Sequence, residues 1–298
     1  MKSEFFRFVF FILCLSLISS FISSFRSQDR RYTYADSGIS SEEVTSEDSF
    51  LIRASIEYLS FCKSLIVGDG QTIAGESVYS HIAERLLPTF HLAIFSILFG
   101  SFFGIFFSLF ALYLRNKFFD EVLSRIAEII LSTPVFVFSI LLLILFFYKW
   151  ELLPPGGYEP LQTYYVILPG IALGIRVFAR VYLFQAKEVW TESNSSYVLL
   201  LQTRAYPWRH IVFSEIFRKV LPFTLIIIIL DFSSLISGAM IVEEIFFYPG
   251  IGKSLFYSIK SMDSILLATL LMYVGIVFYI MNRITFYWQK YLLGESNV

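Results

Sequence analysis

The residue types that most often carry catalysis occur in this chain, but not at the spacings that catalysis requires. His81, His91 and His210 lie far apart, and none forms the H-E-x-x-H pattern that holds zinc on one helix face. No serine lies in a G-x-S-x-G turn, and no pair of carboxylates lies near a histidine in a pattern typical of hydrolysis. We therefore expect no catalytic residue, no metal site and no cofactor bound by this chain.

Two short motifs suggest chemistry that their surroundings contradict. "GIGKS", residues 250–254, resembles the end of a phosphate-binding loop, but that loop needs a glycine at position 247, where the chain has Phe. "NSS", residues 194–196, is a formal glycosylation sequon. The topology described below places it in the cytoplasm, so we do not expect it to be glycosylated.

One acidic residue lies in the middle of a strongly apolar stretch. Asp231 occurs within "LIIIILDFSSLISG", where an ionisable side chain costs roughly 2.5 to 3.5 kcal/mol to insert into a membrane. It should therefore face a cavity or a partner, and Ser233, Ser234 and Ser237 extend the polar stripe. The stripe either lines a translocation path or packs against a second subunit. Arg176 either pairs with Asp231 or reaches the membrane interface by snorkelling.

The composition predicts an all-α membrane protein that holds these residues on six helices. The chain has 298 residues, of which 56% are hydrophobic and 34 are Phe, and its mean hydropathy is +0.69. Crossing a bilayer takes about 20 apolar residues. Six stretches reach that length, with the first expected to be a retained helix and not a cleaved signal: Phe5–Phe25, Thr89–Leu114, Leu123–Tyr148, Tyr164–Phe184, Leu221–Val242 and Ile265–Phe286.

The distribution of Lys and Arg predicts that both ends of the chain are cytoplasmic. Most basic residues near the spans fall on the side of the N-terminus, and only Lys149, Lys253 and Lys260 lie in the short outer loops. This divides the chain into a first helix at 1–25, a long outer segment at 26–88 and a five-helix core at 89–298. Cys14 and Cys62 lie at different depths, so we expect no disulfide.

The loop between the fourth and fifth spans, residues 185–220, is longer than a simple connection requires. Tyr197 to Thr203 has helix-compatible residues, and Pro207 suits the first turn of a second helix. Apolar residues then recur at helical spacing at Ile211, Val212, Ile216 and Val220. We expect two short helices at the membrane surface, the second leading into the fifth span. The segment could alternatively be an interfacial amphipathic anchor.

The outer loops contain two turns rich in proline and glycine. In "EEIFFYPGIGKSLFYSI", residues 243–259, Pro249, Gly250 and Gly252 predict a turn. A short helix over Ser254–Ile259 should follow it, with Leu255, Phe256 and Ile259 on its apolar side. "LLPPGGY", residues 152–158, predicts a second turn between the third and fourth spans.

Together these segments resemble the permease subunit of ATP-binding-cassette importers, in the class that carries dipeptides, oligopeptides and nickel. "AERLLPTFHLA" at 83–93 is similar to the R-L-x-x-T-x-x-L-A motif of that family, and the outer segment matches its E-x-x-F-x-x-P-G-[LI]-G motif. "LSTPVFVFSILLLILF" with "LLPPGGY" resembles the third span and the following loop. The resemblance covers Tyr58 to Leu293. It departs at Arg204, where the coupling loop of the family has glycine.

The resemblance implies that the segment from Tyr197 to Val220 is gripped by an ATPase subunit, which binds and hydrolyses ATP in place of this chain. Trp208, Ile211 and Val212 would supply apolar anchoring, while Arg204 and Arg209 would pair with acidic groups of the ATPase. The expected coupling residues are Tyr197, Gln202, Thr203, Arg204, Ala205, Trp208, Arg209, Ile211 and Val212. The expected residues of the translocation path or outer gate are Asp231, Ser234, Glu243, Phe246, Pro249, Gly250 and Gly252.

The same resemblance implies the partners and the location. The chain would lie among the lipids of a bacterial inner membrane, paired with a different permease subunit and bound to two ATPases. A substrate-binding protein would contact the outer "YPGIG" turn and the region Tyr58–Pro88. The cargo stays open among peptides, nickel complexes and other small solutes.

Two other classes of function compete with the importer subunit. A secondary transporter driven by an ion gradient would typically contain inverted repeats with interrupted helices, which the sequence does not show. A lipid-modifying membrane enzyme would need His, Asp or Glu clustered at one interface, and no such cluster is evident in the sequence.

Overall fold

Helices form nearly all of the chain that the computed structural model describes, which is residues 6–21 and 58–292 without positions 60, 64, 66, 69, 74, 161 and 262. Within this part, the β-type pairing is a single isolated antiparallel bridge between Gln71 and Ser77. The predicted all-α class is confirmed. Residues 22–57, which include most of the expected outer segment, lie outside the described residues.

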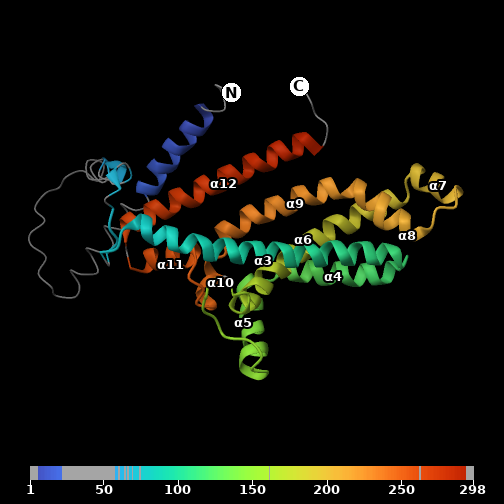
Figure 1. Cartoon of the computed structure of the whole chain (residues 1–298), viewed down its shortest axis with the longest axis horizontal. Coiled ribbons are helices and arrows are strands. Elements are labelled where there is room, and N and C mark those ends of the chain that lie inside the picture. The colour runs from blue at the N-terminus through green and yellow to red at the C-terminus, as the bar shows by residue number, and fades with distance from the viewer. Residues whose placement is uncertain are drawn as a thin grey trace, which may run out of the picture.

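The helices are arranged as a bundle with functional segments at opposite ends (Figure 1). The long helices α3, α6, α9 and α12 extend along the longest axis, with α7 and α8 at one end and α11 at the other. A first helix spans Phe6–Phe21. The remaining elements are α3 (Val78–Tyr113), α4 (Lys117–Ser132), α5 (Val135–Leu142), η1 (Leu143–Lys149), η2 (Tyr164–Val166), α6 (Ile167–Ser193), α7 (Ser196–Thr203), α8 (Trp208–His210), η3 (Ile211–Ile216), α9 (Phe217–Gly238), α10 (Met240–Ile245), α11 (Ile251–Lys260) and α12 (Ser264–Leu292).

Within the described residues, three helices are long and apolar enough to cross a membrane. They are Val78–Tyr113, Tyr164–Ser193 and Ser264–Trp288, and a bent pair of helices raises the number to four if the pair is one span. The helix Phe6–Phe21 is apolar but shorter. The 22-residue α9 lies at the predicted fifth span. Membrane-capable helices are therefore confirmed, while the number six stays a prediction.

The expected third span, Leu123–Tyr148, is not one continuous helix. It consists of α4 and a second helix, Val135–Lys149, which meet at a bend of 102°. Thr133 and Pro134 both have extended backbone, with ψ of 133° and 139°. The ring of a proline disfavours helical geometry in the residue before it, so α4 ends at Ser132. The second helix then points away from the long axis of the bundle (Figure 1).

Glycines allow α3 and α6 to pack closely. A Cβ added to Gly100 would lie 2.5 Å from the carbonyl oxygen of Gly174, and one added to Gly104 would lie 2.9 Å from the side chain of Val181. A Cβ on Gly170 would overlap the Phe95 ring. Such pairs of small residues four apart let two membrane helices approach without a polar bond. The contact forms the base on which α9 lies.

The apolar core continues from this contact to both ends of the bundle. One cluster at the end of α7 and α8 joins Leu109, Val189, Val198 and Ile216. A second joins α3, α6 and α9 to the outer elements through Phe246 and Tyr248. The first helix packs on α12, where Phe11 stacks on Tyr279 with ring centroids 4.8 Å apart.

Candidate functional site

The segment between α6 and α9 forms the two short helices that the sequence predicts. The first is α7, and the second begins at Trp208, passes through the π-helical η3 and continues as α9. Pro207 is the N-cap of α8, with φ of −65°, one residue before its predicted position. Because η3 leads directly into α9, any displacement of the segment is passed to a helix that runs the length of the bundle.

The turn between α7 and α8 is a Schellman motif with alanine at its left-handed position. The N–H of Ala205 donates to Gln202 O at 3.0 Å, and the N–H of Tyr206 donates to Leu201 O at 3.2 Å. Ala205 has φ of 58°, whereas Arg204 keeps φ of −83°. Position 204, where the family has glycine, therefore needs no positive φ in this chain, because Ala205 takes the left-handed conformation instead. Arg204 fits the turn without strain.

Trp208 is held by the end of α3 in the same chain. Its indole N–H donates to the carbonyl oxygen of Tyr113 at 3.0 Å. The guanidinium of Arg115 lies 4.1 Å from the centre of the indole ring. The donor and one face of the ring are thus used within this chain, and Trp208 fixes α8 against α3.

The burial of Ile211 and Val212 corrects their expected role. Both side chains are fully buried, in a cluster with Leu109, Val189 and Val198. They therefore hold the segment on the bundle and do not offer an apolar surface to another protein. The spacing of apolar residues identifies one face of a helix, but it does not reveal whether that face meets its own bundle or a partner.

The surface that remains available lies on α7 and its following turn. Gln202, Thr203, Arg204, Ala205 and Arg209 are all exposed, as the coupling hypothesis requires. Two large apolar side chains that the sequence hypothesis missed are also exposed, Leu199 at 63% and Leu200 at 52%. The sequence signal that would have identified them is a pair of leucines on a short predicted helix beside basic residues.

Tyr197 faces inward at the start of α7. Lys219 lies over its ring at 4.4 Å and pairs with Glu192 of α6. Burial raises the pKa of Tyr197 to about 12, and the charges of Glu192 and Glu215 act in the same direction. Its hydroxyl stays protonated at physiological pH, and the residue ties α7 to α6 and α9.

Asp231 of α9 pairs with Arg180 of α6. An oxygen of the nearly buried Asp231 carboxylate accepts a hydrogen bond from the Arg180 guanidinium. Arg176, the partner considered in the sequence analysis, lines a cavity of about 200 Å³ together with Arg180 and Asp231. Ser234 also lines this cavity. Asp231 and Ser234 of the expected polar stripe therefore face a cavity between α5, α6 and α9, while the side chain of Ser237 lies outside the described residues.

At the opposite end, Glu243 organises the outer turn. This fully buried side chain accepts hydrogen bonds from the Thr89 hydroxyl at 3.0 Å and from the N–H of Lys253 at 2.8 Å. The N–H of Ile251 donates to the Thr89 oxygen at 2.8 Å. Burial raises the pKa of Glu243 to about 7, although bonds from Lys253, Thr89 and Gly252 lower it. The carboxyl joins α3, α10 and the start of α11.

The two glycines of the outer turn are required by this contact. A Cβ on Gly250 would overlap the Glu243 carboxylate, and a Cβ on Gly252 would lie 2.6 Å from the Cα of Met240. Phe246 is fully buried in the core, and its carbonyl oxygen accepts a bond from Gly157 N–H at 3.2 Å. The second outer turn is therefore packed directly on the first.

The helix after Pro249 differs in extent and orientation from the sequence prediction. It begins at Ile251 and ends at Lys260, whereas Ser254–Ile259 was expected. Its buried face contains Ile251, Gly252, Ser254 and Ser258, while Ile259 is 37% exposed. Of the residues predicted on the apolar side, Leu255 packs on the cluster that contains Ile251 and Leu266, so the prediction is correct for Leu255 and wrong for Ile259.

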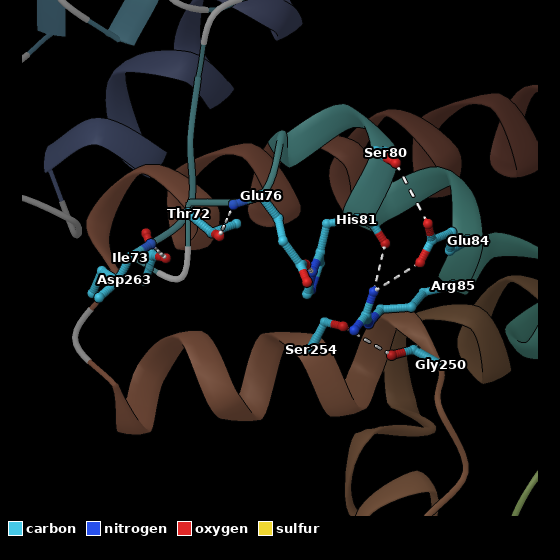
Figure 2. A network of polar contacts seen from close by, with 10 residues as sticks. All are labelled: Thr72, Ile73, Glu76, Ser80, His81, Glu84, Arg85, Gly250, Ser254 and Asp263. Atoms are coloured by element: carbon cyan, nitrogen blue, oxygen red, sulfur yellow. Dashed lines mark hydrogen bonds and ion pairs between the residues drawn. The ribbon is translucent and has the colours of Figure 1, made fainter.

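Polar contacts surround the space between this outer helix and the start of α3 (Figure 2). The N–H of Ile73 donates to Asp263 at 2.8 Å, His81 lies 3.1 Å from Glu76, and Arg85 donates to the carbonyl oxygen of His81 at 3.0 Å. These residues line an open cavity of about 450 Å³ together with Lys253 and Tyr257. The outer end is thus polar and hollowed where the two expected docking regions meet.

The comparisons with known proteins agree with this arrangement. A family model described as "Binding-protein-dependent transport system inner membrane component" matches residues 96–294. A protein of Brucella abortus (strain 2308), named as a peptide transport system permease, is 26% identical over 218 residues, covering 70% of this chain and 69% of its own. The glutathione transport system permease protein GsiC of Escherichia coli (strain K12) is 26% identical over 212 residues, covering 71% and 69%.

Because the family model matches well over half of the chain, the chain belongs to the binding-protein-dependent transport system inner membrane component family. It is an inner-membrane permease component of an ATP-binding-cassette importer.

Proposed function

We propose that this chain is one of two different permease subunits of an importer that carries peptides across a bacterial inner membrane. The two relatives described above are named for peptide and for glutathione, which is itself a small peptide. The chain would cross the membrane six times with both ends in the cytoplasm. Its residues Asp231 and Ser234 would lie on the solute path, and Glu243 with the "YPGIG" turn would form the outer gate.

The observation that carries the proposal is the continuity between an exposed tip and a central helix. Gln202 to Pro207 are exposed, and the helix that begins at Trp208 continues without interruption into α9, which contains Asp231. Buried Ile211 and Val212 prevent the segment from moving independently of the bundle. A push on the tip would therefore reach the cavity beside Asp231 as a rigid-body shift.

A separate ATPase subunit would supply that push, and ATP would be bound and hydrolysed there. Leu199 and Leu200 offer the apolar part of the contact, since both are exposed on α7. Arg204 and Arg209 would orient the contact by pairing with acidic side chains, because charged rims steer association more than they add affinity. These four residues replace Ile211 and Val212 as the expected contact surface.

The outer end would receive the substrate-binding protein. The cavity beside Arg85 and Lys253 is bordered by residues 72–85 and by α11, and both regions were expected to contact that protein. A protein seated there would rest directly on the helix whose first turn Glu243 holds. Arrival of the loaded binding protein could in this way be sensed by the gate.

Affinity purification of the chain with its complex tests the proposal. A C-terminally tagged chain, extracted gently from its own cells, should bring with it a second permease and an ATPase that contains phosphate-binding loops. The double variant R204E/R209E should lose the ATPase at least tenfold and keep the second permease, because both arginines are exposed.

The variant R125E serves as a control, because Arg125 is exposed on α4 and pairs with Glu121 four residues earlier in the same helix. It should retain both partners. Unchanged ATPase recovery with R204E/R209E, or recovery of the chain without any ATPase, would contradict the proposed coupling.

A further inference from the structure

The cavity between α5, α6 and α9 contains charged groups that the fold leaves incompletely paired. Its volume is about 200 Å³. The residues around it are Val135, Leu173, Arg176, Val177, Arg180, Asp231, Ser234 and Leu235. Two arginines and one aspartate therefore surround a space that is otherwise lined mainly by apolar side chains.

The Asp231 carboxylate is the buried member of this group. Its side chain is 4% exposed, and one of its oxygens accepts the bond from Arg180. The other oxygen, Oδ2, is buried and has no hydrogen-bond partner among the described residues. A buried charged acceptor without a partner loses the hydrogen bonds it makes to water, so such an atom calls for an explanation.

The two arginines provide more donors than the cavity uses. A guanidinium carries five N–H donors. Within the described residues, Arg180 donates one hydrogen bond, to Asp231, and its side chain is 43% exposed. Arg176 lies one helical turn before it on α6 and borders the same cavity. Two guanidinium charges face one carboxylate, so the fixed side-chain charge at the cavity is positive.

We propose that this cavity is a subsite for the carboxylate end of a zwitterionic organic solute. The carboxylate binds the free donors of Arg176 and Arg180, because the planar fork of a guanidinium matches the two oxygens of a carboxylate. The ammonium group of the solute, or a backbone N–H near its charged end, donates to Asp231 Oδ2. The solute then supplies partners both for these arginine donors and for Asp231 Oδ2.

The positions of the three residues explain how such a subsite opens and closes. Asp231 lies on α9, which is continuous with the coupling segment, while both arginines lie on α6. A shift of α9 relative to α6 separates Asp231 from Arg180 and changes the number of donors facing the solute. This inference rests on the proposed function, since it assigns the cavity to the solute path.

Chemical labelling of a cysteine at Ser234 tests the charge of the cavity. Cys14 and Cys62 are first replaced by serine, since both are free thiols, and S234C is then introduced into the complete transport complex in lipid nanodiscs. An anionic and a cationic methanethiosulfonate of similar size are compared. The anionic reagent should react faster, by an order of magnitude or so, because the nearby fixed charge is positive.

Variants of Arg176 separate this effect from a general property of the surface. R176Q should lower the ratio of anionic to cationic labelling about tenfold, and R176K should keep it, because lysine retains the charge. R125Q removes the same charge from the exposed face of α4 and should leave the ratio unchanged. A ratio that favours the cationic reagent, or that R176Q does not alter, would overturn the proposal.

Protection from labelling identifies the chemical class of the solute. Glutathione and trialanine should slow labelling of S234C, whereas trialanine amide, which lacks the carboxylate, should not. The R125Q control should behave like the parent protein. R176K should weaken protection, since an ammonium cannot form the fork that binds a carboxylate. Equal protection by the amide, or no protection by either carboxylate, would overturn the assignment.

These outcomes are independent of the coupling experiment. Loss of anion preference with normal ATPase recovery would refute the subsite and leave the proposed importer role intact. Anion preference with no recovered ATPase would leave the subsite and refute the coupling.

Discussion

Glu243 shows how a carboxyl group is used inside an apolar core. Its two oxygens accept from Thr89 on α3 and from the first turn of α11, so one side chain holds three segments together. Replacing a hydrogen-bonded buried group usually costs stability, because the donors that faced it lose their acceptor. The cost of burying its charge acts against these bonds and is the larger effect, so the pKa of Glu243 is raised to about 7.

This balance predicts a dependence of stability on pH. Between its ordinary pKa of 4.5 and about 7, Glu243 keeps a proton in the folded protein that the unfolded chain releases. The free energy of unfolding should therefore fall as pH rises through this range, by about 3 kcal/mol in total, and then level off. E243Q cannot ionise at this position. The Tm of E243Q minus the Tm of the wild type, both measured in detergent, should therefore increase as the pH rises from 4.5 to 7.5.

An exposed carboxylate provides the matched control for that experiment. Glu128 lies on the exposed face of α4, and E128Q removes the same charge from the surface. If the Tm of E128Q minus that of the wild type increases with pH as much as it does for E243Q, burial of Glu243 is not the cause of the pH dependence.

At the scale of elements, three helices end in a turn whose left-handed position holds a residue other than glycine. Arg115, Ala205 and Phe247 follow α3, α7 and α10 with φ of 52°, 58° and 51°. In each case the next residue donates back to the carbonyl oxygen five residues earlier, as in a Schellman motif. Glycine is the usual residue at such positions, and another residue pays roughly 1 to 2 kcal/mol of conformational strain there.

The turn between α7 and α8 therefore yields a test that distinguishes two neighbouring positions. A205G should raise the stability of the segment by about 1 kcal/mol, because glycine relieves the strain at positive φ. R204G should not, since Arg204 already has negative φ. Hydrogen exchange of the amide groups of α7 measures the difference. Slower exchange in R204G than in A205G would contradict the assignment of the turn.

Much of this element-scale structure could be predicted from hydropathy and turn residues. Short helices around Pro207 and after Pro249 could be predicted, because proline and glycine restrict the backbone locally, but the second begins at Ile251, three residues before the predicted start. The partner of Asp231 could not be chosen between arginines, since Arg176 and Arg180 lie on the same face of α6. The pairs Gly100 with Gly104 and Gly170 with Gly174 mark the contact of α3 and α6, but the spacing alone does not name the partner helix.

At the scale of the whole molecule, the bend at Pro134 determines the number of spans. Its two arms, Lys117–Ser132 and Val135–Lys149, form either one broken span or a re-entrant pair. The first arm has exposed charges at Glu121, Arg125 and Glu128, which a straight span would place in lipid at considerable cost. The Lys and Arg distribution nonetheless requires a crossing between Lys117 and the outer turn at Gly157.

Reporter fusions along the chain test this crossing. Alkaline phosphatase is active only outside the cytoplasm, and green fluorescent protein folds to a fluorescent state readily within it. Fusions after Asn116, Thr203 and Val298 should be fluorescent, and phosphatase fusions after Gly157 and Lys260 should be active, because basic residues favour the cytoplasmic side. Matching signals after Asn116 and Gly157 would mean that the bent pair does not cross. The outer turn at Gly157 packs on Phe246 of the gate, so that result would also place the gate on the cytoplasmic side and contradict the proposed direction of transport.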